Sequence, residues 1–370
     1  MNCYQLQLGS VPGSEERLSE VKQLEVHELL DPNFYKQPGA HVILMPPTQE
    51  DPDYYTADLR RKLTQRFRLP GFFFDHMGWD SNGFFGSVGI SSSSSAGRSD
   101  RDFGGCGTFS RFLSKKVDDR NASPESSEYI WHYMGFSTLW LKHMEGQQKS
   151  EAECDMPLPS GETHIMLCFD LDKHMSSKLV RLLRDTDLLE SQNEPFFLLK
   201  VALETVVAQF EEDLGSFRRP IRKIEKERYS SFKDNHAYSR ADIDDTKLEQ
   251  LSERYATLHE VSRHVIHISE TLNAAVTNAA AILQDHKLWR RSLEASSAYP
   301  NNTARTLGLY SNLLSNLKLR ADAFVSRMEN EIKCASNLLG VFNNNISLQT
   351  LNTTRDELRV LQYQLFNARG

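Results

Sequence analysis

The stretch Leu309-Tyr-Ser-Asn-Leu-Leu-Ser-Asn-Leu-Lys-Leu-Arg320 begins a long run in which apolar residues recur in steps of three and four, or small multiples of seven. The apolar positions of the run are Tyr310, Leu314, Leu317, Ala321, Phe324, Met328, Ala335, Leu338 and Phe342. This spacing places them on one face of an α-helix and is typical of helices that pack as coiled coils. The sequence therefore predicts a long helix that follows Pro300-Asn-Asn-Thr303.

A second run with the same spacing of apolar residues precedes this helix. Its apolar positions are Leu248, Leu251, Tyr255, Leu258, Val265, Leu272, Val276, Ala279 and Leu283. We expect two antiparallel helices of roughly 40 residues, each about 60 Å long. A shorter helix is predicted from Pro195, with Phe197, Val201, Leu203, Val207 and Phe210 on its buried face. It is expected to end at Pro220 or, kinked there, to reach Tyr229.

The part of the chain before residue 190 has a different sequence pattern, in which Pro and Gly interrupt short apolar runs. Strands are predicted at Ala40–Met45 and Thr163–Phe169, and Tyr129–Met134 and Ser137–Leu141 read as a hairpin that turns near Gly135. A helix is predicted at Ala57–Arg68, ended by Leu69-Pro70. Gly83–Gly107, with its serine run, is expected to be a flexible insertion.

These patterns together predict an α+β fold, with a small mixed sheet and helices in the N-terminal half and long antiparallel, coiled-coil-like helices in the C-terminal half. The expected divisions are an N-terminal extension with a short strand (1–54), an α/β module (55–190) with the insertion near 83–107, and a long-helix bundle (191–370).

Composition excludes few functions. The chain has 370 residues with 43 Lys and Arg against 50 Asp and Glu, and this mild acidity disfavours nucleic acid as a partner. No stretch approaches the 20 or so apolar residues that a membrane helix needs, and the N-terminus lacks the pattern of a secretory signal. Five scattered cysteines without a CxxC spacing are expected to be reduced thiols of a cytoplasmic protein.

Several stretches resemble the cytosolic part of fungal CorA-like magnesium-transporter proteins. They are Tyr129-Ile-Trp-His-Tyr-Met-Gly-Phe-Ser-Thr-Leu-Trp140, Leu309–Arg320, Leu69-Pro-Gly-Phe-Phe-Phe-Asp75 and Arg327-Met-Glu-Asn-Glu-Ile-Lys333. The resemblance covers the chain from about residue 55. It implies the fold, a tendency to oligomerise, and a cytosolic sensing or docking role. Unlike the family, this sequence has no Gly-Met-Asn motif and no membrane span after the long helix, so conduction is not carried over.

Three acidic groups are candidates for binding Mg²⁺ through oxygen ligands: Asp170-Leu-Asp172 after a strand, Asp242-Ile-Asp-Asp245 in a connector, and Glu211-Glu-Asp213 on a helix. A solvated surface is the competing interpretation for each, and none can be matched to the family's regulatory cation positions. The metal ligands are therefore unknown at this point.

Two further clusters have a functional and an ordinary interpretation. His264-Val-Ile-His267, with His259, could present imidazoles to a metal, but no carboxylate completes the set and polar helix faces often carry histidines. The basic stretch Arg218–Arg228 could touch phosphate or lipid head groups, but its acids alternate with its bases as on a solvated helix face. No GxSxG, GxGxxG or GxxxxGK[ST] motif supports catalysis.

The sequence therefore predicts a non-enzymatic, soluble CorA-like protein without a cofactor, with a response to Mg²⁺ left open. It would form a homo-oligomer or bind a helical protein partner, with no nucleic acid and with at most peripheral membrane contact. Two alternatives are a shortened form of a CorA-like divalent-cation transporter whose membrane spans are missing, and a helical interaction scaffold unrelated to ions.

Overall fold

The structure is a computed structural model that describes residues 3–8, 18–31, 34, 39–48, 54–75, 81–91, 103–123, 126–142, 162–186, 193–235, 245–293 and 302–367. The chain divides into two compact units. Unit 1 contains residues 1–216 and 268–319, and unit 2 contains residues 217–267 and 320–370.

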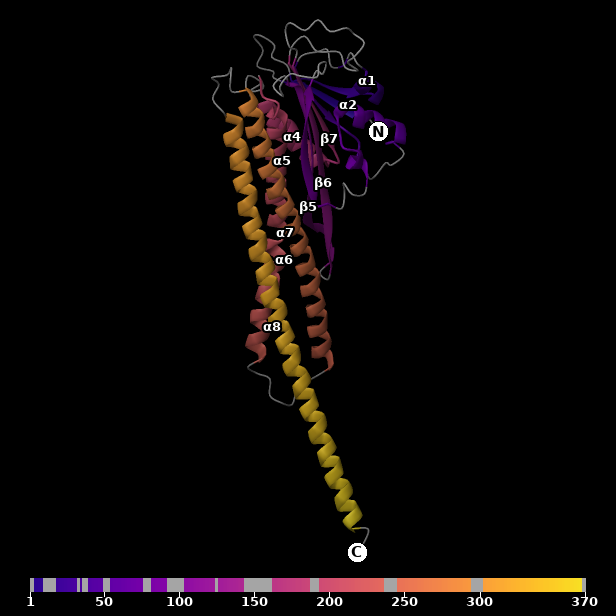
Figure 1. Ribbon diagram of the computed structural model, residues 1–370. Coiled ribbons are helices and arrows are strands. Elements are labelled where there is room, and N and C mark those ends of the chain that lie inside the picture. Colours follow the sequence, from indigo (N-terminus) through magenta and orange to yellow (C-terminus); the bar gives the residue numbers. More distant parts are fainter. Residues whose placement is uncertain are drawn as a thin grey trace. The chain divides into compact units, whose positions relative to one another are not determined.

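A seven-stranded mixed sheet forms the centre of unit 1 (Figure 1). Its strands are β1 (Cys3–Leu8), β2 (Leu18–Leu24), β3 (Gly39–Leu44), β4 (Gly83–Ser91), β5 (Phe103–Ser123), β6 (Ser126–Lys142) and β7 (Glu162–Phe169), in the spatial order β2-β1-β3-β7-β6-β5-β4. The described neighbours pair antiparallel, except that β3 and β7 run parallel. Strand β7 therefore joins an N-terminal group of three strands to a second group of three.

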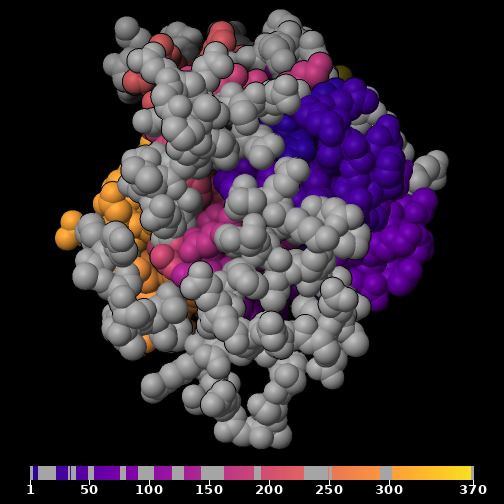
Figure 2. All heavy atoms as spheres, turned by 90° about the horizontal axis from the view of Figure 1, so that it is seen from above, coloured from indigo at the N-terminus to yellow at the C-terminus, as the bar shows by residue number. Residues whose placement is uncertain are grey.

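One face of the sheet is covered by α1 (Val26–Leu30), α2 (Ala57–Phe67) and the 3₁₀ turn η2 (Gly71–Phe74). Thr56 caps the start of α2 by accepting a hydrogen bond from the Leu59 amide, and Arg68 ends the helix in the left-handed conformation, with φ 54°. Figure 2 shows the indigo and purple side chains of this N-terminal part of unit 1 gathered into one surface.

The opposite face is covered by α4 (Lys173–Asp185), α5 (Phe197–Ser216) and the part of α7 (Asp245–Leu293) that begins at Ile268. Alternation along β6 divides its side chains between the two layers. Leu139 and Leu141 enter the core under α2, whereas the Trp140 ring meets Trp289 of α7 edge-on at 6.0 Å. The sheet is therefore buried on both faces in this region.

The described part of unit 2 consists of helices. It contains α6 (Arg218–Asn235), the part of α7 up to His267, and the part of α8 (Asn302–Asn367) from Arg320. Buried side chains from all three helices form its core: Ile221, Ile224, Leu258, Val261, Val265, Phe324 and Met328. Arg327 makes two hydrogen bonds of 2.7 Å to the carboxylate of Glu225, which ties α8 to α6.

The predicted α+β class is confirmed, and so are the strands near Ala40 and Thr163 and the helix at Ala57. The long helices have 49 and 66 residues, more than the predicted 40, because heptad spacing marks a packed face and not the full length of a helix. The break before α6 falls at Phe217, so Pro220 lies in the first turn of α6, where its missing N–H leaves no hydrogen bond unmade.

Two predictions about the first half are wrong. Residues 129–141 form one strand and not a hairpin, because Gly135 lets β6 pass close to β7; a Cβ there would lie 3.1 Å from Phe169 Cβ. The start of the expected insertion, Gly83–Ser91, is strand β4 paired with β5, and Phe103–Gly107 belongs to β5. Residues 92–102, with most of the serine run, lie outside the described residues.

Within the part of the chain that the structure describes, no helix has the length and apolarity to cross a membrane. The four cysteines described there, Cys3, Cys106, Cys168 and Cys334, are free, and Cys154 lies outside the described residues.

Candidate functional site

Asp170 and Asp172, the first acidic pair singled out above, serve different partners. The Asp170 carboxylate accepts hydrogen bonds from the Thr48 amide (2.5 Å) and hydroxyl (2.9 Å), and from Arg111 (3.0 Å). Asp172 instead caps α4, accepting from the Met175 amide at 2.7 Å. Since the Asp170 side chain is 6% exposed and fully engaged, the pair does not present two open carboxylates to a shared cation.

Arg111 on β5 is the cation that holds Asp170. Its guanidinium also donates to the Phe73 carbonyl oxygen at 3.2 Å and lies 4.6 Å from the centre of the Phe73 ring. Burial lowers the pKa of Arg111, and the charge of Asp170 opposes that shift. This ion pair fastens the end of β7 to β5 and, through Arg111, to the 3₁₀ turn η2 that follows α2.

The three consecutive carboxylates of Glu211-Glu-Asp213 also separate. Glu211 is exposed, Glu212 faces α4 and β5, and Asp213 is fully buried against β6. Glu212 contacts Lys116 at 2.6 Å, His174 at 3.1 Å and Lys178 at 3.4 Å. Three donors around one carboxylate form a dense ionic contact between α4, α5 and the sheet.

Asp213 lies at the centre of a second contact, with His132 of β6. Its Oδ2 is 2.9 Å from His132 Nδ1, and its Oδ1 accepts from Gln209 Nε2 at 2.8 Å. On the other side of the ring, His132 Nε2 is 3.6 Å from Asp172 Oδ2. The last turn of α5 and the first residue before α4 therefore share one imidazole.

The Glu212 contact predicts a loss of stability at low pH. Partial burial acts to raise the pKa of Glu212, but Lys116, His174 and Lys178 outweigh it and lower that pKa to about 2 from 4.5. A carboxylate with a lowered folded-state pKa stabilises the protein above its unfolded value, and this contribution disappears as pH falls from 4.5 towards about 2. Glu212→Gln should thus lower the melting temperature near neutral pH, and the deficit should shrink across this window in thermal scans. Glu211→Gln, on the exposed neighbour, is the matched control and should show no such trend.

The histidines of α7 do not converge on one point. His264 is 2.7 Å from Glu260, the ring of His259 packs on Tyr255 at 4.5 Å, and the rings of His264 and His267 are 5.9 Å apart. Within the described ranges there is no group of three or more His, Cys, Asp or Glu residues able to hold a metal.

Two further stretches are the acidic connector at 242–245 and the basic stretch at 218–228. Asp242–Asp244 lie outside the described residues. On α6, Arg218, Arg222 and Lys223 are exposed, while Arg228 pairs with Glu331 of α8 at 2.8 Å. Part of the basic stretch therefore helps to hold unit 2 together.

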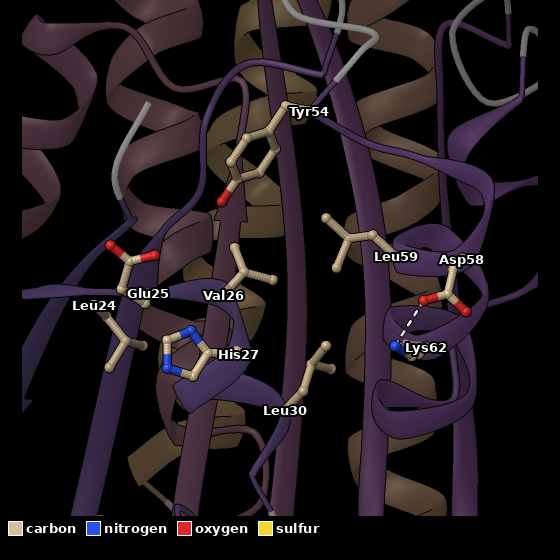
Figure 3. A pocket seen from close by; sticks show the side chains of 9 residues that line it. All are labelled: Leu24, Glu25, Val26, His27, Leu30, Tyr54, Asp58, Leu59 and Lys62. Atoms are coloured by element: carbon tan, nitrogen blue, oxygen red, sulfur yellow. Dashed lines mark ion pairs between the residues drawn. The ribbon is translucent and has the colours of Figure 1, made fainter.

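A cavity of 370 Å³ in unit 1 is formed by the residues around α1 and the start of α2 (Figure 3). It is lined by Leu24, Glu25, Val26, His27, Leu30, Tyr54, Asp58, Leu59 and Lys62. Among the lining residues, Asp58 forms an ion pair with Lys62 at 2.6 Å, and Glu25 takes part in the cap of α1. The lining combines apolar side chains with charged and aromatic ones, and it contains no Ser, Thr or Cys that could act as a nucleophile.

Sequence reasoning missed His132, Arg111 and Lys116. Each lies on a long strand whose apolar residues dominate its pattern, and each acquires its role from a partner far along the chain. A signal was available on β5, where the charged residues Arg111 and Lys115 lie on the same face of a strand whose residues are mostly buried.

No family model matches the chain, and no curated protein sequence matches it. Similar solved structures include the cytoplasmic domain of ZntB from Vibrio parahaemolyticus, with 10% identity, 93% of this chain and 98% of that chain covered, and a TM-score of 0.42. The CorA magnesium transporter from Methanocaldococcus jannaschii has 10% identity, coverages of 96% and 83%, and a TM-score of 0.44. Its soluble domain has 8% identity, coverages of 90% and 95%, and a TM-score of 0.38.

Proposed function

We propose that this chain is a non-enzymatic, cytoplasmic CorA-like protein that self-associates through the last part of α8 and responds to Mg²⁺. The observation that carries the proposal is the exposed apolar surface of residues 341–366, called here the α8 end segment. Figure 1 shows this yellow segment continuing beyond α6 and the α7 portion of unit 2.

The α8 end segment has a heptad spacing of its own. Leu351, Leu358 and Leu365 recur every seven residues and are 65%, 56% and 62% exposed. Further apolar residues are exposed on the same segment: Val341, Leu348, Val360, Leu361, Tyr363 and Phe366. From Leu358 to Phe366, six of the nine residues are apolar and lie on several sides of the helix, separated by Arg359, Gln362 and Gln364. Apolar residues on several sides of a helix favour its burial in an assembly. The segment therefore supports association with several helices.

The partner that fits best is the same segment of other copies. Leu repeats at seven-residue spacing pack against identical repeats when copies align in register. The charges also suit self-association, because the two arginines, Arg355 and Arg359, are balanced by Asp356 and Glu357. Neighbouring copies would meet without net repulsion.

The response to Mg²⁺ rests on the resemblance of residues 309–320 and 327–333 to the CorA-like family. A hard cation needs about six oxygen ligands, and the described carboxylates of one chain form no cluster of three. We infer that carboxylates from different copies supply the ligands, so that Mg²⁺ would favour the oligomer over the monomer.

Size-exclusion chromatography with light scattering, run with and without millimolar Mg²⁺, tests the proposal. We expect a discrete oligomer whose population rises with Mg²⁺. Leu351→Asn with Leu358→Asn should shift it to monomer, since each buried Leu contributes about 1.5–3 kcal/mol. The matched control is Leu309→Asn with Leu319→Asn, two exposed leucines of α8 outside the segment, which should leave the oligomer intact.

Each other outcome has a defined meaning. An oligomer that the segment variant abolishes but Mg²⁺ does not affect would remove the ion response and leave a helical scaffold. A monomer under every condition would overturn self-association, and a helical partner of another kind would then be the better account.

A further inference from the structure

His132 occupies a buried position between three elements of unit 1. The residue lies on β6 and is 8% exposed. Its two ring nitrogens face different carboxylates, Asp213 in the last turn of α5 at 2.9 Å and Asp172 at the start of α4 at 3.6 Å. An imidazole with a carboxylate on each side is best satisfied when both nitrogens carry a proton.

Asp213 depends on this arrangement. The residue is 0% exposed, and a carboxylate without water needs a positive partner or several donors. Within the described part of the chain, the Asp213 carboxylate pairs with His132 and accepts its other hydrogen bond from Gln209, whose Nε2 also lies 3.1 Å from His132 Nδ1. Loss of the His132 proton would leave a buried charge held by neutral donors.

The charged groups around His132 come from every element packed on it. Burial lowers the pKa of the imidazole, the hydrogen bond and charge of Asp213 raise it, and Asp172 raises it further. Lys116 on the neighbouring strand β5 acts in the opposite direction. The net result is a pKa above the ordinary value of 6.5.

The same contacts determine where two helices are held. Asp172 is the N-cap of α4, so its second oxygen joins that cap to His132. Three residues after Asp213, the Ser216 hydroxyl accepts a hydrogen bond from the Val117 amide of β5 at 2.9 Å and donates to the Asp213 carbonyl at 2.6 Å. Ser216 is the last residue of α5 and of this stretch of unit 1.

We propose that His132 is a proton-responsive clamp, which holds the cap of α4 and the last turn of α5 against β6 when protonated and releases them when neutral. The clamp is independent of the α8 end segment, so it stands or falls separately from self-association. The clamp gives unit 1 a local response to pH near Ser216, where the first stretch of unit 1 ends.

The direction of the response follows from the raised pKa. A group whose folded-state pKa lies above its unfolded value stabilises the folded form fully below that unfolded value, here 6.5, and the effect is lost as pH rises through the folded pKa. Each unit between the two values changes the opening equilibrium about tenfold. The clamp is therefore closed in mildly acidic solution and loosens on the alkaline side.

Hydrogen–deuterium exchange of the full chain, corrected for the intrinsic effect of pH on exchange, measures the clamp directly. Amides in residues 172–176 and 209–216 should lose protection as pH rises above 6.5, and NMR should show His132 titrating above that value. Asp172→Asn keeps an N-cap side chain but removes one charge, so it should move both midpoints to lower pH. His174→Asn, on an exposed histidine that contacts Glu212 instead, should leave both midpoints unchanged.

His132→Asn removes the titration itself. Its protection in residues 172–176 and 209–216 should be low at every pH and should not respond to pH in this window. A His132 that titrates at or below 6.5, midpoints unmoved in Asp172→Asn, or the same loss of protection with pH in His132→Asn would each overturn the clamp.

Discussion

Arg111→Met is expected to lower the free energy of unfolding by about 3–5 kcal/mol, as measured by chemical denaturation. The substitution keeps an unbranched side chain of similar length in the core but leaves Asp170 buried without its cation. The Asp170 side chain is 6% exposed and the Arg111 side chain 5%, so water cannot replace the lost contact. The hydrogen bond to the Phe73 carbonyl would be lost as well.

The matched control is Arg61→Met on α2. Arg61 pairs with Asp58 at 2.8 Å, but both side chains are more than half exposed, so the loss should stay below about 1 kcal/mol. The double variant Arg111→Met with Asp170→Asn removes both charges and should be less destabilised than the sum of the two single changes. If Arg111→Met and Arg61→Met lowered the free energy of unfolding equally, the buried ion pair would stabilise the protein no more than the exposed one.

Phe169→Ala should cost about 3–5 kcal/mol of unfolding free energy for a different reason, the cavity left in the core. Phe169 ends β7, is 0% exposed, and packs edge-on against Phe73 at 5.3 Å and Phe74 at 5.8 Å. Its removal takes away a contact of both rings at once.

The control for this prediction lies in the same aromatic run. Phe72→Ala removes a ring of the same size that is 37% exposed, so it should cost much less in the same denaturation experiment. Comparable losses for the two variants would mean that the neighbouring core closes over the Phe169 site.

The helices could be predicted because their periodicity is local. The six heptad positions from Tyr310 to Met328 lie in a single helix, and all six are buried. The strands β1 and β2 were not predicted. In β1, Tyr4, Leu6 and Leu8 alternate with Gln5 and Gln7, but the run is only six residues long, and β2 has no such alternation. Their place in the sheet comes from the pairing of β1 with both β2 and β3. Gly135 was read as a turn because a glycine inside a strand looks the same as one between two strands.

The candidate sites depended on information that one segment of sequence does not contain. Asp170 and Asp172 are two residues apart, but one meets Arg111 and the other caps a helix. The His132 contact brings together β6, the start of α4 and the end of α5, and no spacing along the chain encodes that meeting. Acidic residues that are close in the sequence were therefore recognised as candidates, but the side chains that they contact could not be predicted.

The central position of β7 has a consequence for synthesis of the protein. As the chain is made, β1, β2 and β3 are complete early, and β4, β5 and β6 follow as a second group. In the folded sheet β7 lies between the two groups, which do not pair with each other. The backbone edges of β3 and β6 stay unpaired until residues 162–169 are made, and among the described strands β7 is the last along the chain. Until then each nascent half presents an open strand edge, the kind of surface that promotes aggregation and chaperone binding.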